Sequence, residues 1–378
     1  LSALFPRAGG QYVYLKESFN PLVGFLYGWG FFAVIQTGTI AAVGVAFSKF
    51  TAYLIPGVSE DLVLFTIGGL AISPAQMLSL AIIILLTYIN TKGIKNGKLI
   101  QTTFTIVKIL SIFSLIVFGL MAANGTIWQS NWSNPWELHH LNEDGSTGHY
   151  MLITALGAIA AAMVGSIFSS VAWENVTFIG GEIKKPRRNV GLSLFLGTFI
   201  VTLIYVAMNI MYTAVLPMQE IAYAEKDRVA VVVSHAIFGN IGTYIIAVMI
   251  MISTFGCNNG LILSGARVYY TMAKDGLFFK KTGELNKYAV PEFGLWIQCV
   301  VACLLCLSGR YGDLLDMVSF VVVLFYVLTI IGIFVLRKKM PDAERPYKAF
   351  GYPVVPAVYI LLGLAFCVLL LVHKPPYA

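Results

Sequence analysis

The sequence is short of charge. Asp, Glu, Lys and Arg make up 11% of its 378 residues, whereas 58% of the residues are hydrophobic. A soluble domain carries about 25% charged residues, so this composition excludes a cytosolic or secreted protein and indicates a polytopic membrane protein. The net charge of +7 does not indicate nucleic-acid binding, because the positive residues lie between apolar runs, as the positive-inside rule requires.

Residue patterns that carry enzyme chemistry are missing. The sequence has no H-E-x-x-H and no G-x-S-x-G, and none of its five histidines lies in the middle of an apolar run, where a catalytic base or a haem ligand would lie. One Lys inside an apolar run does not build the ring of like groups that an ion-selectivity filter needs. We therefore favour neither of two alternatives, a membrane-embedded enzyme or a channel, and expect no catalytic residue and no cofactor.

The cysteines offer no disulfide framework. All five lie in apolar runs: Cys257, Cys299, Cys303, Cys306 and Cys367. A buried Cys behaves as a small hydrophobe, so we interpret these residues as packing residues rather than as a disulfide set or a metal site.

What the chain does contain is a series of long apolar runs. A helix needs about 20 apolar residues to cross the hydrocarbon core, and nine runs meet this need, near 21–54, 74–90, 99–122, 151–179, 190–216, 236–272, 291–308, 312–336 and 352–372. The run 236–272 is so long that it must tilt or project beyond the bilayer. Residues 1–5 look like the end of a further helix. We expect a single transmembrane domain over 1–378, and a native chain that extends on both sides.

The loops between the runs alternate in charge. Loops 6–20, 91–98, 180–189, 273–290 and 337–351 carry 18 of the 25 Lys and Arg residues, and the loops between them carry four. The positive-inside rule therefore predicts that the first set is cytoplasmic, in a protein that crosses the cell membrane many times.

Three positive residues lie inside apolar runs: Lys49, Lys108 and Arg267. Lys49 and Arg267 are near the ends of their runs, where a long side chain can snorkel to the interface. Lys108 lies near the middle of "IQTTFTIVKILSIFSLIVFGLM", where a Lys costs about 2.5–3.5 kcal/mol. Such a residue faces the interior of the bundle and is a functional candidate; a structural ion pair is the alternative.

A polar stretch, "FSSVAWEN", begins at Phe168 inside another apolar run. Serines and a carboxylate at this depth fit a helix that is broken inside the protein around a cavity, where freed backbone groups can bind a polar ligand. We expect regular helical hydrogen bonding to be lost over Phe168–Ala172. The alternative is an intact helix whose serines bond back to their own backbone and whose Glu174 pairs with a buried cation.

The sequence around this stretch, "GSIFSSVAWENVTFIGGEIKKPRRNVGLSL", resembles the sixth transmembrane helix and following loop of the amino acid–polyamine–organocation (APC) transporters, and their L-type amino acid transporter branch above all. "FPRAGGQYVYLKE" resembles the loop after the second helix, and "GIKNGKLIQTTFTIVKI" resembles the start of the fifth. "IYVAMNIMYTAVLP", "FGCNNGLILSGARVYYTMAKDGLF" and "RKKMPDAERPYK" resemble the seventh helix, the eighth helix and the loop after the tenth.

The resemblance implies an all-α fold with two inverted five-helix repeats. The nine runs match helices three to eleven of the family's twelve, so the first helix, most of the second and the twelfth are absent here. A second departure is that Ser169–Ala172 is not glycine-rich, and Glu174 stands where the L-type branch usually has Asn. Arginine/agmatine antiporters place a Glu at the matching position, six residues after an aromatic residue.

The resemblance also implies alternating access about a site in the middle of the membrane. By residue, it implies a substrate site made of the aromatic lid Phe168, the backbone of Ser169, Ser170, Val171 and Ala172, and Trp173 and Glu174 below them. We expect sodium-independent exchange of small or medium neutral amino acids. Proton-coupled transport, or transport of a cationic amino acid or polyamine, through Glu174 is the alternative. The sequence does not identify a partner chain.

Lys108 matches the fifth-helix lysine of the sodium-independent branch, whose ammonium stands where sodium-coupled relatives hold an ion. Tyr205, with Asn209 one turn on, matches the seventh-helix tyrosine near that lysine. The resemblance thus implies that Lys108, Tyr205 and Asn209 link the moving parts of the transporter in place of a bound ion.

Overall fold

The computed structural model describes residues 1–6, 8–67, 70–136, 139–141, 147–149, 152–308, 311–345 and 347–373. Regular structure in these residues is almost entirely helical, as the sequence predicts. The helices are α1 (Gly10–Ser18), α2 (Pro21–Gly30), α3 (Gln36–Thr51), α4 (Pro74–Thr91), α5 (Ile94–Met121), α6 (Gly125–Asn131), α7 (Leu152–Ser169), α8 (Pro186–Val215), α9 (Met218–Ala222), α10 (Val229–Phe238), α11 (Asn240–Lys274), α12 (Glu292–Ser308), α13 (Tyr311–Lys339) and α14 (Val354–His373). Strands β1 (Phe65–Ile67) and β2 (Leu70–Ile72), and β3 (His139–Leu141) and β4 (Thr147–His149), form two antiparallel hairpins.

Short polar signals fix where the apolar helices begin. Asn20 accepts a 3.0 Å hydrogen bond from the backbone amide three residues on, and Pro21 opens α2, where its missing N–H leaves no partner unsatisfied. Ser73 and Gln76 form a reciprocal capping box at the start of α4, with Pro74 as the first helical residue. A π-helical turn, Phe31–Ile35, joins α2 to α3 into one span.

Eight helical stretches of the described residues are long and apolar enough to cross a membrane, and they correspond to eight of the nine predicted runs. The ninth, 291–308, is α12, a helix of 17 residues. At 1.5 Å per residue it is about 25 Å long, the short end of what spans the hydrocarbon core. Helix α11 has 35 residues, about 52 Å, so it is longer than the core is thick, as predicted for 236–272.

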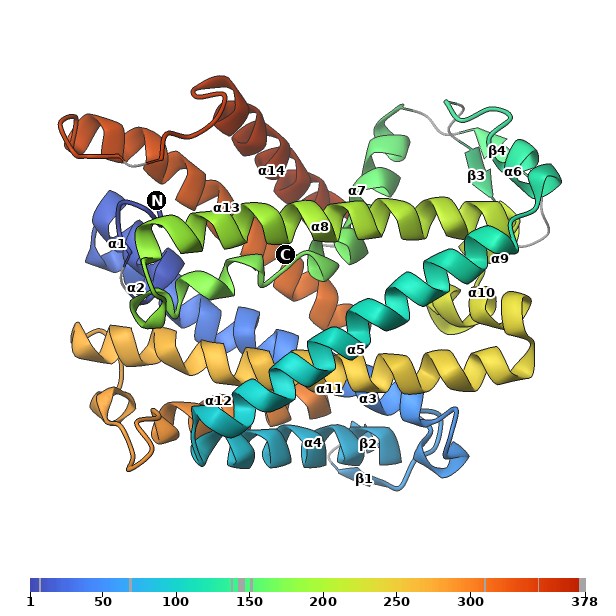
Figure 1. Cartoon of the computed structure of the whole chain (residues 1–378), viewed down its shortest axis with the longest axis horizontal. Coiled ribbons are helices and arrows are strands. Elements are labelled where there is room, and N and C mark those ends of the chain that lie inside the picture. Colours follow the sequence, from blue (N-terminus) through green and yellow to red (C-terminus); the bar gives the residue numbers. More distant parts are fainter. Residues whose placement is uncertain are drawn as a thin grey trace.

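Buried apolar side chains form three clusters. The largest joins α1, α2, α3, α4, α11, α12 and α13. A second joins α5, α8, α10 and α11, and a third joins α7, α13 and α14. Helix α5 runs obliquely across α11 towards α8 (Figure 1) and packs on both. Gly28 allows α2 to approach α11 closely, because a Cβ at that position would overlap the side chain of Met272.

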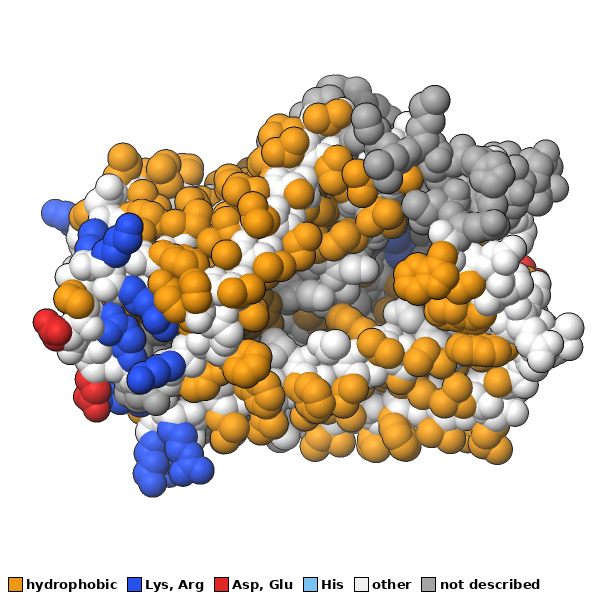
Figure 2. All heavy atoms as spheres, turned by 90° about the horizontal axis from the view of Figure 1, so that it is seen from above, with side chains coloured by type: hydrophobic (Ala, Val, Ile, Leu, Met, Phe, Trp, Pro, Cys, Tyr) orange, Lys and Arg blue, Asp and Glu red, His pale blue; other side chains and the backbone are white. Residues whose placement is uncertain are grey.

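Helices α5 and α8 expose much of their apolar surface, including Phe113, Phe195 and Phe199. Apolar side chains cover much of the face in Figure 2, while Lys and Arg side chains gather at one end of the molecule. A hydrocarbon environment favours this distribution, because it offers polar side chains no partners.

The predicted break in the helix that contains Phe168 is present, but it starts later than expected. Phe168 and Ser169 still belong to α7, and the turn follows at 170–172. The hydroxyls of Ser169 and Ser170 donate to the carbonyl of Ser166, at 2.9 and 2.8 Å, and such bonds compete with regular helical bonding and favour a bend at the end of α7. Ala172 then takes a left-handed conformation, with φ 70° and ψ 9°, which ends the helix.

The residues directly after the break do not form an α-helix. Trp173–Thr177 and Gly180–Glu182 form short 3₁₀ turns, and regular α-helix resumes only at Pro186. The predicted run 151–179 is therefore present as a span over Thr154–Thr177, but it is α-helical only as far as Ser169 and continues in 3₁₀ turns where α-helix is expected after the break.

Candidate functional site

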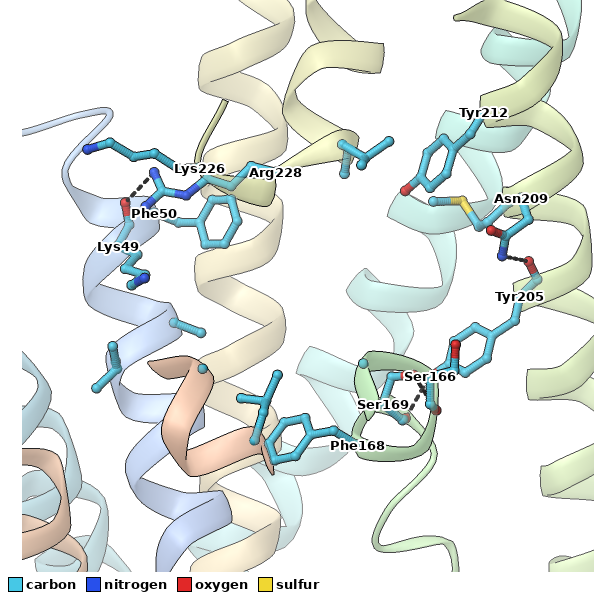
Figure 3. A pocket seen from close by; sticks show the side chains of 18 of the residues that line it. Lys49, Phe50, Ser166, Phe168, Ser169, Tyr205, Asn209, Tyr212, Lys226 and Arg228 are labelled. Carbon is cyan, nitrogen blue, oxygen red and sulfur yellow. Dashed lines mark hydrogen bonds between the residues drawn. The ribbon is translucent and has the colours of Figure 1, made fainter. Parts of the chain in front are cut away.

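A cavity of about 1900 Å³ lies between α3 on one side and α7 and α8 on the other. It is visible as a hollow in the face of Figure 2, and Figure 3 shows the side chains that line it. Its volume exceeds the roughly 300–1,000 Å³ of an ordinary ligand pocket. A small solute would therefore occupy only part of it.

The last turn of α7 forms one wall of the cavity. Ser166, Phe168, Ser169 and Ser170 all line it, and the ring of Phe168 points from the end of α7 towards α3 (Figure 3). This wall combines an aromatic face with hydroxyl and backbone oxygens. It can therefore cover an apolar group and accept hydrogen bonds from a polar one.

The adjacent wall is α8, and it contacts the end of α7 directly. The hydroxyl of Tyr205 donates a 2.7 Å hydrogen bond to the carbonyl of Ser169, one of the carbonyls that a helix end leaves without a partner in its own helix. The side-chain amide of Asn209 donates to the carbonyl of Tyr205 at 2.8 Å. Tyr205, Asn209 and Tyr212 follow one another along α8 and line the cavity (Figure 3).

The charged residues of the cavity gather at the end where α3 finishes. Lys49 forms a 2.9 Å ion pair with Glu60, and Glu60 forms a second 2.9 Å ion pair with Arg228. Lys226 pairs with Asp61 at 2.6 Å, and all five residues line the cavity. In the Lys226–Asp61 pair, which lies in loops outside the membrane-spanning helices, the hydrogen bond lowers the pKa of Asp61 and raises the pKa of Lys226.

The structure brings together five of the ten residues that the sequence nominates: Phe168, Ser169, Ser170, Tyr205 and Asn209 line one cavity. Val171, Ala172, Trp173, Glu174 and Lys108 are not among the lining residues. The part that each of the ten plays in substrate binding or coupling stays a prediction.

Glu174 lies in the 3₁₀ turn after the break and is buried. It accepts a 2.7 Å hydrogen bond from the hydroxyl of Tyr326 on α13. The ring of Trp173 contacts the same tyrosine edge-on, with 5.8 Å between centroids, and Asn175 donates to the hydroxyl of Ser264 on α11 at 3.1 Å. The segment after the break is thus attached to α11 and α13 rather than to the cavity.

Lys108 is half-buried on α5, which packs against α11 around Phe104 and Phe255. Its positive charge acts electrostatically on the thiol of Cys257, which lies on α11. Among the described residues Lys108 forms no hydrogen bond or ion pair. Lys108 follows Phe104 by one turn, so it lies on the face of α5 that packs against α11.

Sequence reasoning missed the charged end of the cavity. Lys49 was expected to snorkel, as was Arg267, which instead is buried on α11 with a hydrogen bond to the carbonyl of Leu263. The sequence does not indicate that Glu60 and Arg228 form a pair, because the two residues are 168 positions apart. No group of three or more His, Cys, Asp or Glu side chains in the described part of the chain is placed to hold a metal ion.

Comparison with known proteins places this geometry in a family. The sequence model of the amino acid permease family matches residues 1–376. The chain belongs to this family. The predicted membership of the APC superfamily is thereby confirmed, as is the transporter character of its relatives.

Individual relatives are distant but extend over nearly the whole chain. The b(0,+)-type amino acid transporter 1 of Mus musculus is 26% identical over 386 residues, which cover 100% of this chain and 72% of that protein. The serine/threonine exchanger SteT of Bacillus subtilis (strain 168) is 28% identical over 358 residues, 94% of this chain and 74% of that protein. The Asc-type amino acid transporter 1 of Mus musculus is 26% identical over 379 residues, 99% of this chain and 66% of that protein.

Proposed function

We propose that this protein is a secondary transporter, one transmembrane domain over 1–378, that exchanges amino acids across the cell membrane by alternating access. The observation that carries the proposal is the break at the end of α7, which opens on a cavity in a chain matched by the amino acid permease family over residues 1–376. The names of the relatives, which include amino acid transporters and a serine/threonine exchanger, support it.

We propose small or medium neutral amino acids as the substrates. The walls beside the break, formed by Phe168, Ser169, Tyr205 and Asn209, carry no charged side chain. Such walls suit a zwitterion with an uncharged side chain, because a second unpaired charge would be costly to desolvate there. The loops 6–20, 91–98, 180–189, 273–290 and 337–351 are proposed to be cytoplasmic, since they hold most of the Lys and Arg residues.

We propose that exchange needs no sodium, because Lys108 can supply a fixed positive charge between α5 and α11. Proton-linked uptake is the second candidate function. It is favoured by the buried carboxyl of Glu174, whose side chain is hydrogen-bonded by the neutral hydroxyl of Tyr326 and pairs with no cation among the described residues.

Exchange in liposomes tests the proposal. Liposomes that contain the protein are loaded with unlabelled serine, threonine or alanine, and uptake of a radiolabelled neutral amino acid is measured in sodium-free buffer. Uptake is expected to depend on the internal amino acid and to be unchanged when sodium is added. Uptake without internal amino acid would indicate a channel or a uniporter, chemical conversion without uptake would indicate an enzyme, and uptake that follows a pH gradient would favour the proton-linked candidate.

A further inference from the structure

A carboxylate, Glu60, joins two segments that are far apart in the sequence. One of its oxygens lies 2.9 Å from the ammonium of Lys49, and the other lies 2.9 Å from the guanidinium of Arg228. Lys49 is in the last turn of α3, and Arg228 is the residue immediately before α10. Glu60 therefore bridges the end of α3 and the start of α10.

Contacts with two aromatic rings and with Glu60 hold the side chain of Arg228 in place. The guanidinium lies over the rings of Phe50 and Tyr53, 5.4 and 5.3 Å from their centroids, and only 9% of the side chain is exposed. The planar guanidinium of arginine can lie flat on a ring while its edge pairs with a carboxylate, a combination that the compact ammonium of lysine makes less well. Arg228 is thus attached to the α3 side through both Glu60 and the two rings.

The bridge crosses the cavity at one end. Lys49, Phe50, Glu60 and Arg228 line the cavity, and Figure 3 shows the side chain of Arg228 extending towards the end of α3, where Lys49 and Phe50 lie, across the cavity from Tyr205 and Tyr212 on α8. Helix α10 packs on α5, α8 and α11, and the chain runs from α8 through α9 and the 3₁₀ turn Glu225–Asp227 to Arg228. The bridge therefore connects the α3 wall of the cavity to the connection that leaves the α8 wall.

We propose that Glu60 is a positioning residue for exchange, one that holds the α3 wall and the α8–α10 connection together at this mouth of the cavity and releases them when the mouth opens. This inference rests on the proposed function, because alternating access requires each mouth to open and close once in every cycle. Partly exposed ion pairs suit this task, since each contributes little enough to be broken and re-formed. The neighbouring Asp61–Lys226 pair reinforces the same mouth from its exposed rim.

Access to the cavity provides a test that does not depend on transport. The five native cysteines are replaced, and Thr202, which lines the cavity on α8, is changed to Cys as a reporter. The rate at which a membrane-impermeant methanethiosulfonate modifies this reporter is measured in liposomes. Glu60→Gln is expected to raise the rate about fivefold, the change in population that accompanies the loss of one such ion pair.

Two further variants separate a specific bridge from a general effect of charge. Both changes remove the Glu60–Arg228 ion pair, and Arg228→Gln also removes the stacking on Phe50 and Tyr53, so Arg228→Gln should raise the rate at least as much as Glu60→Gln does. The double variant should be no faster than Arg228→Gln alone, because the shared ion pair is already broken in that variant. Glu225→Gln is the matched control. It removes a carboxylate three residues before Arg228 that forms no ion pair among the described residues, so the modification rate should not change.

Exchange kinetics supply a second readout. If Glu60→Gln favours the open mouth, the half-saturating concentration of substrate should fall, because more of the protein is competent to bind, while the maximal rate also falls, because the mouth must still close in each cycle. A merely misfolded variant loses maximal rate without the fall in half-saturating concentration. Glu60→Asp keeps the charge on a shorter side chain and should give intermediate values.

The inference is overturned if the modification rate of the Glu60→Gln variant stays within twofold of its parent, or if the effects of the Glu60→Gln and Arg228→Gln changes multiply in the double variant. Should Glu60→Gln fail to fold, Arg228→Gln and Glu60→Asp decide the question by the same measurement. If the unaltered protein exchanges no amino acid while the modification rates change as expected, the proposed function fails and the role of Glu60 at this mouth stands.

Discussion

Tyr326 donates a 2.7 Å hydrogen bond to the carboxyl group of Glu174, and this bond attaches the segment after the break in α7 to α13. The two residues are 152 positions apart. The bond lies in the interior, where Glu174 is 8% exposed. The position of the break thus depends on a contact with a helix from the other half of the chain.

The first prediction concerns this bond. Tyr326→Phe removes the donor and leaves a buried carboxyl group without it, so the free energy of unfolding should fall by about 1–3 kcal/mol. Thermal unfolding in detergent measures the loss. Glu174→Gln is the companion variant, because its amide oxygen still accepts the bond and the fold should be retained. If Glu174→Gln leaves both the rate of neutral amino acid exchange and its pH profile unchanged, Glu174 is structural and the proton-linked candidate is abandoned.

The sequence predicts the start of α4 well because the signal there is local. Ser73, Pro74 and Gln76 contain the whole capping box, and nothing distant is needed to form it. The place where α7 ends is different. Ser169 is held by the hydroxyl of Tyr205, 36 positions away, and helix propensity cannot register such a contact.

The sequence likewise predicts some residues of the candidate site and not others. A polar stretch inside an apolar run pointed to Phe168 and the serines, because buried polar groups need partners wherever they lie. It could not show that Glu174 faces Tyr326 instead of the cavity. Lys49 near the end of a run predicts a snorkelling side chain equally well with or without the carboxylate of Glu60 beside it.

The second prediction concerns the link between α8 and the break. Tyr205→Phe removes the bond to the carbonyl of Ser169 and should lower the free energy of unfolding by about 0.5–1.5 kcal/mol. We also expect a several-fold slower exchange, since the bond holds a wall of the cavity. Tyr212→Phe is the control: Tyr212 lines the same cavity on the same helix, and its hydroxyl forms no hydrogen bond among the described residues. Equal effects of the two changes would contradict a specific role for Tyr205.

The third prediction concerns Lys108. Lys108→Ala should fold and purify but should exchange between about 5-fold and 150-fold more slowly, the range expected when one coupling free energy of 1–3 kcal/mol is lost. Lys108→Met keeps the length of the side chain without its charge and should be equally impaired, whereas Lys108→Arg should retain more activity. A Lys108→Ala variant that exchanges at the unaltered rate without sodium would show that the ammonium has no coupling role.

The fourth prediction concerns pH. The pKa of Asp61 is lowered from its ordinary value of 3.8, so the stabilisation from its pair with Lys226 is present above that value and is lost as the pH falls through the lower, folded value. The pKa of Lys226 is raised from 10.5, so the stabilisation is complete below 10.5 and is lost as the pH rises through the higher, folded value. The pair should therefore stay intact between about pH 5 and pH 9.

It follows that Asp61→Asn should leave the shape of the pH profile of exchange unchanged over this interval, even if it changes the rate. The measurement is exchange in liposomes with the same pH on both sides, from pH 5 to pH 9. A profile that changes shape in the Asp61→Asn variant would show that this pair titrates within the interval, against the direction of both shifts.

The last prediction concerns the backbone of the break. Ala172 has φ 70° and ψ 9°, a left-handed conformation that costs a residue with a Cβ about 1–2 kcal/mol and costs glycine almost nothing. Replacing Ala by Gly also gives the unfolded chain more freedom, which costs roughly 0.4–1 kcal/mol. Ala172→Gly should therefore be neutral or slightly stabilising, although Ala→Gly ordinarily destabilises a helix. Ala172→Val should be the more damaging change, because a β-branched side chain tolerates positive φ least. Thermal unfolding of both variants ranks them, and if Ala172→Gly lowers the midpoint more than Ala172→Val does, residue 172 is not left-handed in the folded protein and the break must lie elsewhere.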